Sequence, residues 1–276
     1  MLFVIAGFLC HRQNLKIYIK KKINRILIPF ITFSMLKIIY IFFVSNQFSH
    51  SENIGVQLYD AFICGGLYWF PYALLFMYFL APFIWKDERN KAFNNKTLIL
   101  LIIVFAFNTL RDVFTFDLPR VFQFSQMMDN LHFFLIGMII AENKSRVILL
   151  FNKYEIFIKI GGVLILAAFV FTDIIEYPII MLSLQILVAL SLMYFFYKFA
   201  KILKPNNYIL KTIGKYSYQI MFLDSFFRVV LYKLASYLPY ENIMVLNLVM
   251  ILNVFFSCVV CIILEKIPII KKAIGL

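Results

Sequence analysis

The chain has 276 residues, of which 63% are hydrophobic and only 15% are charged, and its mean hydropathy is +0.88. Soluble globular domains are roughly half apolar and about a quarter charged, so this composition excludes a soluble enzyme, a disulfide scaffold and a disordered chain. The formal net charge is +13, with 27 Lys and Arg against 14 Asp and Glu. Because the basic residues lie beside apolar segments, we expect a lipid bilayer, and not nucleic acid, as the partner.

A helix needs about 20 mostly apolar residues to cross the hydrocarbon core of a bilayer. The shorter apolar run Met1–Leu9 covers only about half of that thickness. The sequence therefore predicts an all-α integral membrane protein, a polytopic bundle of eight full transmembrane helices plus an N-terminal half helix, in one membrane domain over residues 1–276. The eight predicted spans are approximately Leu27–Val44, Leu67–Trp85, Thr97–Phe116, Met127–Ala141, Ile156–Ile175, Ile179–Ala200, Ser217–Ala235 and Ile243–Leu264.

Strongly basic loops alternate with loops that carry little or no Lys and Arg. The stretch His11–Ile26 is strongly basic, the stretch Ser45–Gly66 has no Lys or Arg, and the alternation continues to Lys271 and Lys272 near the C-terminus. Cytoplasmic loops carry the excess of Lys and Arg in membrane proteins, so the basic loops and the C-terminus are predicted to face the cytoplasm. We accordingly expect a multi-pass protein of the cell membrane.

The same alternation places Met1 partway through a helix that descends from the outer side. An amino-terminal charge at that depth would be desolvated without a partner. We therefore expect the chain to be N-terminally incomplete, with a helix upstream of Met1.

Ionisable side chains inside the predicted spans are candidates for function, because a charge at the centre of a membrane helix costs about 3 kcal/mol on insertion scales. Asp224 and Arg228 lie four residues apart and so share one helical face. They either neutralise each other for structural reasons or line a polar substrate path. Lys37 also needs a partner. His132, near the outer end of its span, either lines an outward-facing cavity or caps the membrane interface.

A basic string that includes Lys22 and Arg25 precedes the first full span. It either anchors the topology or binds an anionic cytoplasmic ligand, such as the phosphates of a nucleotide-like cofactor. Lys and Arg neutralise phosphate, and Arg can bind it through two parallel hydrogen bonds.

Cys258 and Cys261 form a C-x-x-C pair, a spacing that serves redox or metal chemistry in other settings. Here the pair lies in a wholly apolar helix with no cation nearby, so we expect it to pack against lipid or protein. The sequence predicts no metal.

Several separated segments together resemble motifs of the membrane-bound acyltransferase family 3, the polytopic O-acyltransferases of bacteria and animals. The segment Leu67–Pro82 resembles the branch that acetylates surface polysaccharides. Two positions differ from the family pattern: Lys22 stands where the family has an arginine, and Asp224 stands where it commonly has a histidine. The segments that carry the resemblance are Val4–Leu9, Lys22–Pro29, Leu67–Pro82, Leu131–Met138 and Ile213–Asp224.

The resemblance implies transfer of an acyl group, usually acetyl, from cytoplasmic acyl-CoA to a hydroxyl of a surface polysaccharide or lipid-linked sugar. Under this interpretation Lys22 and Arg25 contact the phosphates of acyl-CoA, and Trp69, Asp224 and Arg228 lie along the substrate path. The outer loop Ser45–Gly66 then lies near the sugar.

The catalytic base is left open by the resemblance. The family's first helix, which carries the histidine thought to be the base, is absent from this chain, so we expect little turnover from the chain as given. His132 and Asp224 are the remaining candidates.

Other functions remain open at this point. A non-catalytic transporter or flippase of cell-surface glycans would show the same topology and the same buried charges, and an inactive remnant of a truncated gene would lack the same helix. The acceptor sugar, the acyl chain and the oligomeric state are not determined by the sequence.

Overall fold

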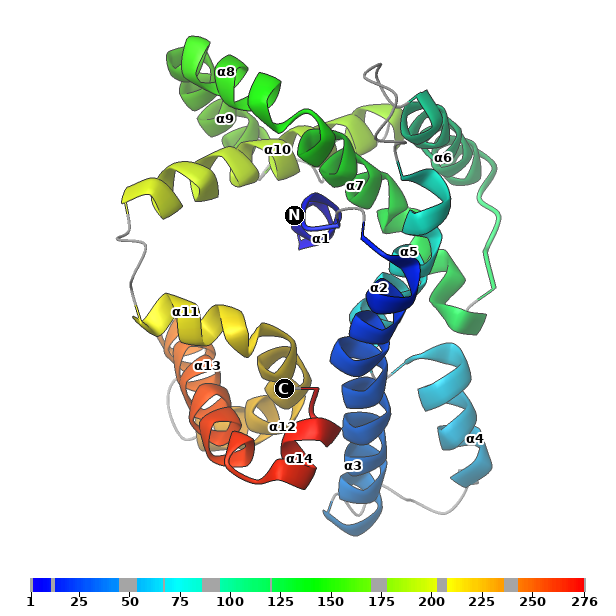
Figure 1. Cartoon of the computed structure of the whole chain (residues 1–276), viewed down its shortest axis with the longest axis vertical. Coiled ribbons are helices and arrows are strands. Elements are labelled where there is room, and N and C mark those ends of the chain that lie inside the picture. Colours follow the sequence, from blue (N-terminus) through cyan, green and yellow to red (C-terminus); the bar gives the residue numbers. More distant parts are fainter. Residues whose placement is uncertain are drawn as a thin grey trace. The chain divides into compact units, whose positions relative to one another are not determined.

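The structure is a computed structural model of the whole chain. It describes residues 2–10, 13–44, 54–66, 68–85, 95–119, 121–169, 178–202, 208–235 and 243–275. Helices dominate these ranges and no strand occurs within them (Figure 1). The predicted all-α class is therefore confirmed.

The chain packs as two compact units whose sequences are interleaved. Unit 1 comprises Met1–Leu15 and Phe76–Pro205, and unit 2 comprises Lys16–Leu75 and Asn206–Leu276. The helix α5 (Trp69–Ile84) begins in unit 2 and continues into unit 1. The expectation of one membrane domain over residues 1–276 stays a prediction.

Unit 1 is built around α7, which contacts both α1 and α6, while α9 packs against α10. Glu155 at the start of α9 pairs with Lys198 near the end of α10, their side-chain atoms lying 3.0 Å apart. Both residues belong to segments predicted to face the cytoplasm. The helices are α1 (Leu2–Phe8), α6 (Asn95–Phe114), η3 (Val121–Gln123), α7 (Phe124–Glu142), α8 (Lys144–Lys153), α9 (Glu155–Phe169) and α10 (Pro178–Ile202).

Two glycines allow α1 and α7 to approach until their backbones touch. A Cβ atom added to Gly7 would overlap the carbonyl oxygen of Phe134. A Cβ added to Gly137 would overlap the carbonyl oxygen of Val4 and lie 2.8 Å from the backbone nitrogen of Phe8. Small residues serve this purpose at membrane helix crossings, where close van der Waals packing drives association.

Unit 2 is organised by α12, which packs along α13 and also contacts α3. Its core contains stacked rings of Phe33 and Phe222, with centroids 5.1 Å apart, and the Tyr68 hydroxyl donates to the Phe222 carbonyl at 3.1 Å. The elements are α2 (Leu15–Lys22), η1 (Ile23–Leu27), α3 (Ile28–Val44), α4 (Ile54–Tyr59), η2 (Asp60–Cys64), the start of α5, α11 (Tyr208–Lys215), α12 (Ser217–Ala235), α13 (Ile243–Glu265) and α14 (Pro268–Ala273).

Helices occupy most of each predicted span, although residues 170–175 of the span Ile156–Ile175 and residue 67 of the span Leu67–Trp85 lie outside the described residues. Within the described ranges, the helices long and apolar enough to cross a membrane are Asn95–Phe114, Val121–Glu142, Ile180–Phe199 and Leu248–Glu265, and Trp69–Ile84 is a shorter apolar helix. Large apolar side chains such as Phe157, 78% exposed, face outward. Such surfaces are stable in lipid and costly in water. The count of eight full spans stays a prediction.

The α1–α7 crossing predicts that Gly137→Ala destabilises the protein by about 1 to 3 kcal/mol, because the added methyl group forces two backbones apart. Thermal unfolding in detergent measures this effect. Gly161→Ala in α9 is the matched control, since no atom lies within 4 Å of its added Cβ and alanine favours helix. Equal unfolding temperatures for the two variants would show that the crossing is not tight.

Candidate functional site

The basic string lies on α2 and the π-helix η1, which leads into α3. The Lys22 ammonium lies 5.3 Å from the ring centroid of Tyr18, a buried residue, whereas Arg25 in η1 is exposed. The N–H of Ile28 donates to the carbonyl of Ile23, and the next N–H of the π-helix is missing because residue 29 is proline. Pro29 therefore ends the wide turn, and Arg25 lies exposed within it.

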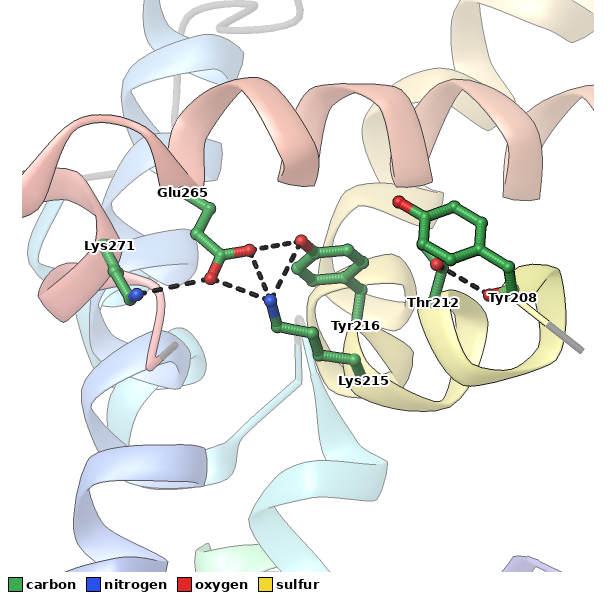
Figure 2. A network of polar contacts seen from close by, with 6 residues as sticks. All are labelled: Tyr208, Thr212, Lys215, Tyr216, Glu265 and Lys271. Atoms are coloured by element: carbon green, nitrogen blue, oxygen red, sulfur yellow. Dashed lines mark hydrogen bonds and ion pairs between the residues drawn. The ribbon is translucent and has the colours of Figure 1, made fainter. Parts of the chain in front are cut away.

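A polar network ties the ends of α11, α13 and α14 together around the Glu265 carboxylate (Figure 2). The Lys215 ammonium donates to both carboxylate oxygens, at 2.8 and 2.6 Å, the Tyr216 hydroxyl donates to the same group, and Lys271 lies 3.3 Å away. The hydrogen bond to Glu265 raises the pKa of Lys215 above its ordinary value. The pKa of Tyr216 is raised by burial and by its bond to Glu265. All four residues belong to segments predicted to be cytoplasmic.

Asp224 faces α13 and meets a residue that sequence reasoning did not identify. The amide of Asn253 donates to the Asp224 carboxylate, and Asn253 is itself buried. One turn further along α13, Ser257 is fully buried, and its hydroxyl has no hydrogen-bond partner among the described residues. The side chain of Arg228 lies outside the described residues, so its predicted pairing with Asp224 stays a prediction.

A second polar group joins α6 to α7 in unit 1. The Arg111 guanidinium pairs with Asp129, and the Asn108 side-chain amide donates to the carbonyl of Met128 at 2.8 Å. Asn108 is buried, and its side-chain oxygen has no hydrogen-bond partner in the described part of the chain. These residues lie near the helix ends that are predicted to face outward.

His132 lies on α7 one turn beyond Met128 and is completely buried, with 0% of its surface exposed. Neither ring nitrogen has a hydrogen-bond partner within the described ranges, and the ring centroid lies 4.0 Å from that of Phe133. Complete burial argues against a role at the water interface. Buried polar atoms are nearly always hydrogen-bonded in proteins, so an unpaired buried imidazole is a natural place for a substrate or water to bind.

Two further predicted residues are Lys37 on α3 and Trp69 at the start of α5. Lys37 has the partner it required, because its ammonium lies 5.1 Å from the ring centroid of Tyr68. A cation over an aromatic face is stabilised by the ring quadrupole, and more so away from water. Trp69, at the start of α5, is 42% exposed.

Sequence reasoning missed Asn108, Asp129 and Asn253, although a usable signal was present. Each is a polar residue inside an apolar helix, and this criterion had identified Asp224. The sequence did not reveal which of these polar residues meet, because their partners lie on different helices.

The Arg111–Asp129 pair predicts non-additive effects on stability. Arg111→Gln leaves the half-buried Asp129 without its cation, whereas Asp129→Asn leaves Arg111 paired with Asp112 alone, at 3.1 Å. The first change is expected to cost about 1 to 3 kcal/mol and the second less. The double variant should cost less than the two single effects together. A double-mutant cycle on unfolding temperature measures the coupling, and simple additivity would contradict the pair.

Residues 1–265 match the family model of the acyltransferase domain of acyltransferase family 3. Neither a curated protein nor a solved structure matches the chain at a significant level. The family match confirms the resemblance carried by the sequence motifs, and because it spans nearly the whole chain, the protein belongs to acyltransferase family 3.

Proposed function

We propose that this acyltransferase moves an acyl group, in the simplest case acetyl, from cytoplasmic acyl-CoA to a hydroxyl of a surface polysaccharide or lipid-linked sugar. The observation that carries the proposal is the exposed basic turn around Arg25 in a chain that belongs to an acyltransferase family. The family assignment gives no support to the transporter alternative.

The donor fits the chemistry of the basic turn. Acyl-CoA carries several phosphate charges, and an exposed guanidinium can bind one of them through two hydrogen bonds. The Lys22 ammonium, held over the Tyr18 ring, is a second cation one helical turn away from Arg25. Both residues precede a span and lie on the side predicted to be cytoplasmic, where acyl-CoA is available.

The acceptor fits the corner formed by α4, η2 and α5, on the side predicted to face outward. Tyr59 and Trp69 expose aromatic rings there, and Asp60 exposes a carboxylate that can accept hydrogen bonds from sugar hydroxyls. Aromatic rings present a large, flat apolar surface with only two side-chain torsions, which suits the apolar C–H face of a sugar ring. Residues 45–53 of the predicted acceptor loop lie outside the described residues.

His132 is the stronger of the two candidate bases. A general base must hold a free lone pair within hydrogen-bond reach of the reacting hydroxyl. The His132 nitrogens have no hydrogen-bond partner in the described part of the chain, whereas the Asp224 carboxylate accepts a hydrogen bond from Asn253.

In the proposed reaction the acceptor hydroxyl attacks the thioester carbonyl carbon, and the base takes the hydroxyl proton. The carbon–sulfur bond breaks, the CoA thiolate leaves, and the proton returns to the thiolate or to solvent. The products are an ester and free CoA.

The donor assignment predicts that Arg25→Ala and Lys22→Ala each weaken CoA binding and reduce its salt dependence, because each removes one phosphate contact. Isothermal titration with CoA in detergent, at two salt concentrations, measures both quantities. Lys96→Ala, an exposed lysine on the same predicted side, serves as the control. Unchanged CoA affinity in the Arg25 and Lys22 variants would mean that the basic string serves only to anchor the topology.

The base assignment predicts that His132→Gln lowers acyl transfer by a factor of about 100 to 10,000, the usual contribution of general-base catalysis, with CoA affinity unchanged. The measurement is release of CoA coupled to acylation of a polysaccharide acceptor. A loss confined to Asp224→Asn would move the role to Asp224. Failure of the unsubstituted chain to transfer would refute His132 as a sufficient base.

A further inference from the structure

The last segment of the chain, Pro268–Gly275, lies beyond the family match yet is fastened into unit 2. The Thr32 hydroxyl on α3 donates to the carbonyl of Ala273 at 3.0 Å. The Gln219 amide on α12 donates to the carbonyl of Ile274 at 2.7 Å, and both Gln219 and Ile274 are buried. In Figure 1 the red helix α14 lies beside α3 within this unit.

Gly275 brings the end of this segment against the turn that carries Arg25. Its φ is +74°, a conformation that side chains other than glycine rarely adopt, and an added Cβ would lie 2.6 Å from both the Asn24 carbonyl oxygen and the Pro29 ring. Asn24 directly precedes Arg25 in η1. The C-terminal backbone therefore touches the turn on both sides of this residue.

The segment also brings positive charge to the same place. Lys272 is exposed, and it is only three residues from Gly275, within about 11 Å of it along the chain. The nearby Glu265 carboxylate already binds Lys215 and Lys271, so it does not neutralise the charges of Lys272 and Arg25. Lys272 at the end of α14 and Arg25 on η1 thus adjoin one predicted cytoplasmic surface.

We propose that the C-terminal segment completes a phosphate-binding site with η1, in which Lys272 contacts phosphate and the seating of Gly275 positions Arg25. The inference rests on the proposed function, because it assigns the phosphates to the acyl-CoA donor. Phosphate headgroups of anionic lipids present the same chemistry, and the experiment separates the two sources.

The first test compares Lys272→Ala with Lys153→Ala, an exposed lysine of unit 1 on the same predicted side. In lipid-free detergent, CoA affinity is measured at low and high salt. Lys272→Ala is expected to weaken CoA binding by up to about fivefold, the size of one exposed charge pair, and to reduce the salt dependence, while Lys153→Ala changes neither.

The second test addresses positioning. Gly275→Ala is compared with Gly214→Ala in α11, where an added Cβ meets no atom within 4 Å. We expect Gly275→Ala to raise the KM for acyl-CoA while leaving the KM for the acceptor unchanged. The control should change neither KM. A purely structural role of Gly275 would lower the unfolding temperature and affect both substrates alike, which would overturn the positioning claim.

A parallel arm adds phosphatidylglycerol to the micelles and follows the unfolding temperature. If Lys272→Ala abolishes stabilisation by phosphatidylglycerol but leaves CoA affinity intact, the donor assignment is overturned. The site then binds the phosphate headgroup of a lipid. If Lys272→Ala changes neither CoA affinity nor the stabilisation by phosphatidylglycerol, the proposed phosphate-binding site is refuted. The proposed function fails separately, when the unsubstituted protein binds no CoA, whereas the inference alone fails when Arg25→Ala weakens CoA binding and the C-terminal variants do not.

Discussion

The rule that a charge or polar group must leave hydrocarbon or find a partner there governs this structure. Most lysines obey it by lying at helix ends, where the ammonium group can reach water. Two charged groups that remain within the helices have partners in the described part of the chain. The Asp224 carboxylate meets the amide of Asn253, and the Lys37 ammonium lies over the Tyr68 ring. Each of these contacts joins segments far apart in the sequence, so solving the solvation problem also fixes which helices pack together.

At the predicted cytoplasmic end of unit 2, one carboxylate has a large structural role. Glu265 ends α13 and binds Lys215 at the end of α11, the adjacent Tyr216, and Lys271 on α14 (Figure 2). This arrangement holds the C-terminal segment in place. There Gln219 donates a hydrogen bond to the segment, and Gly275 of the segment packs against Asn24 and Pro29. A basic surface binds phosphate more tightly when its cations are held in place, because fewer side-chain and backbone motions are lost on binding.

The proposed chemistry also benefits from burial. A thioester can react with water as well as with a sugar hydroxyl, and a base shielded from bulk water favours transfer over hydrolysis. His132 is fully buried among apolar neighbours such as Phe133, so a hydroxyl must be brought to it by binding.

Local composition determined the class of this protein, the positions of its helices and the family to which it belongs. Apolar runs place helices such as α12 and α13, and the motif around Arg25 needs only neighbours in the chain. Tertiary structure decided which polar side chains pair with one another. Nothing near Asp224 indicates Asn253, nothing near Arg111 indicates Asp129, and the seating of Gly275 beside Asn24 joins the two ends of unit 2. The physical reason is that hydrophobicity and charge act on each segment by itself, whereas pairing depends on which helices meet.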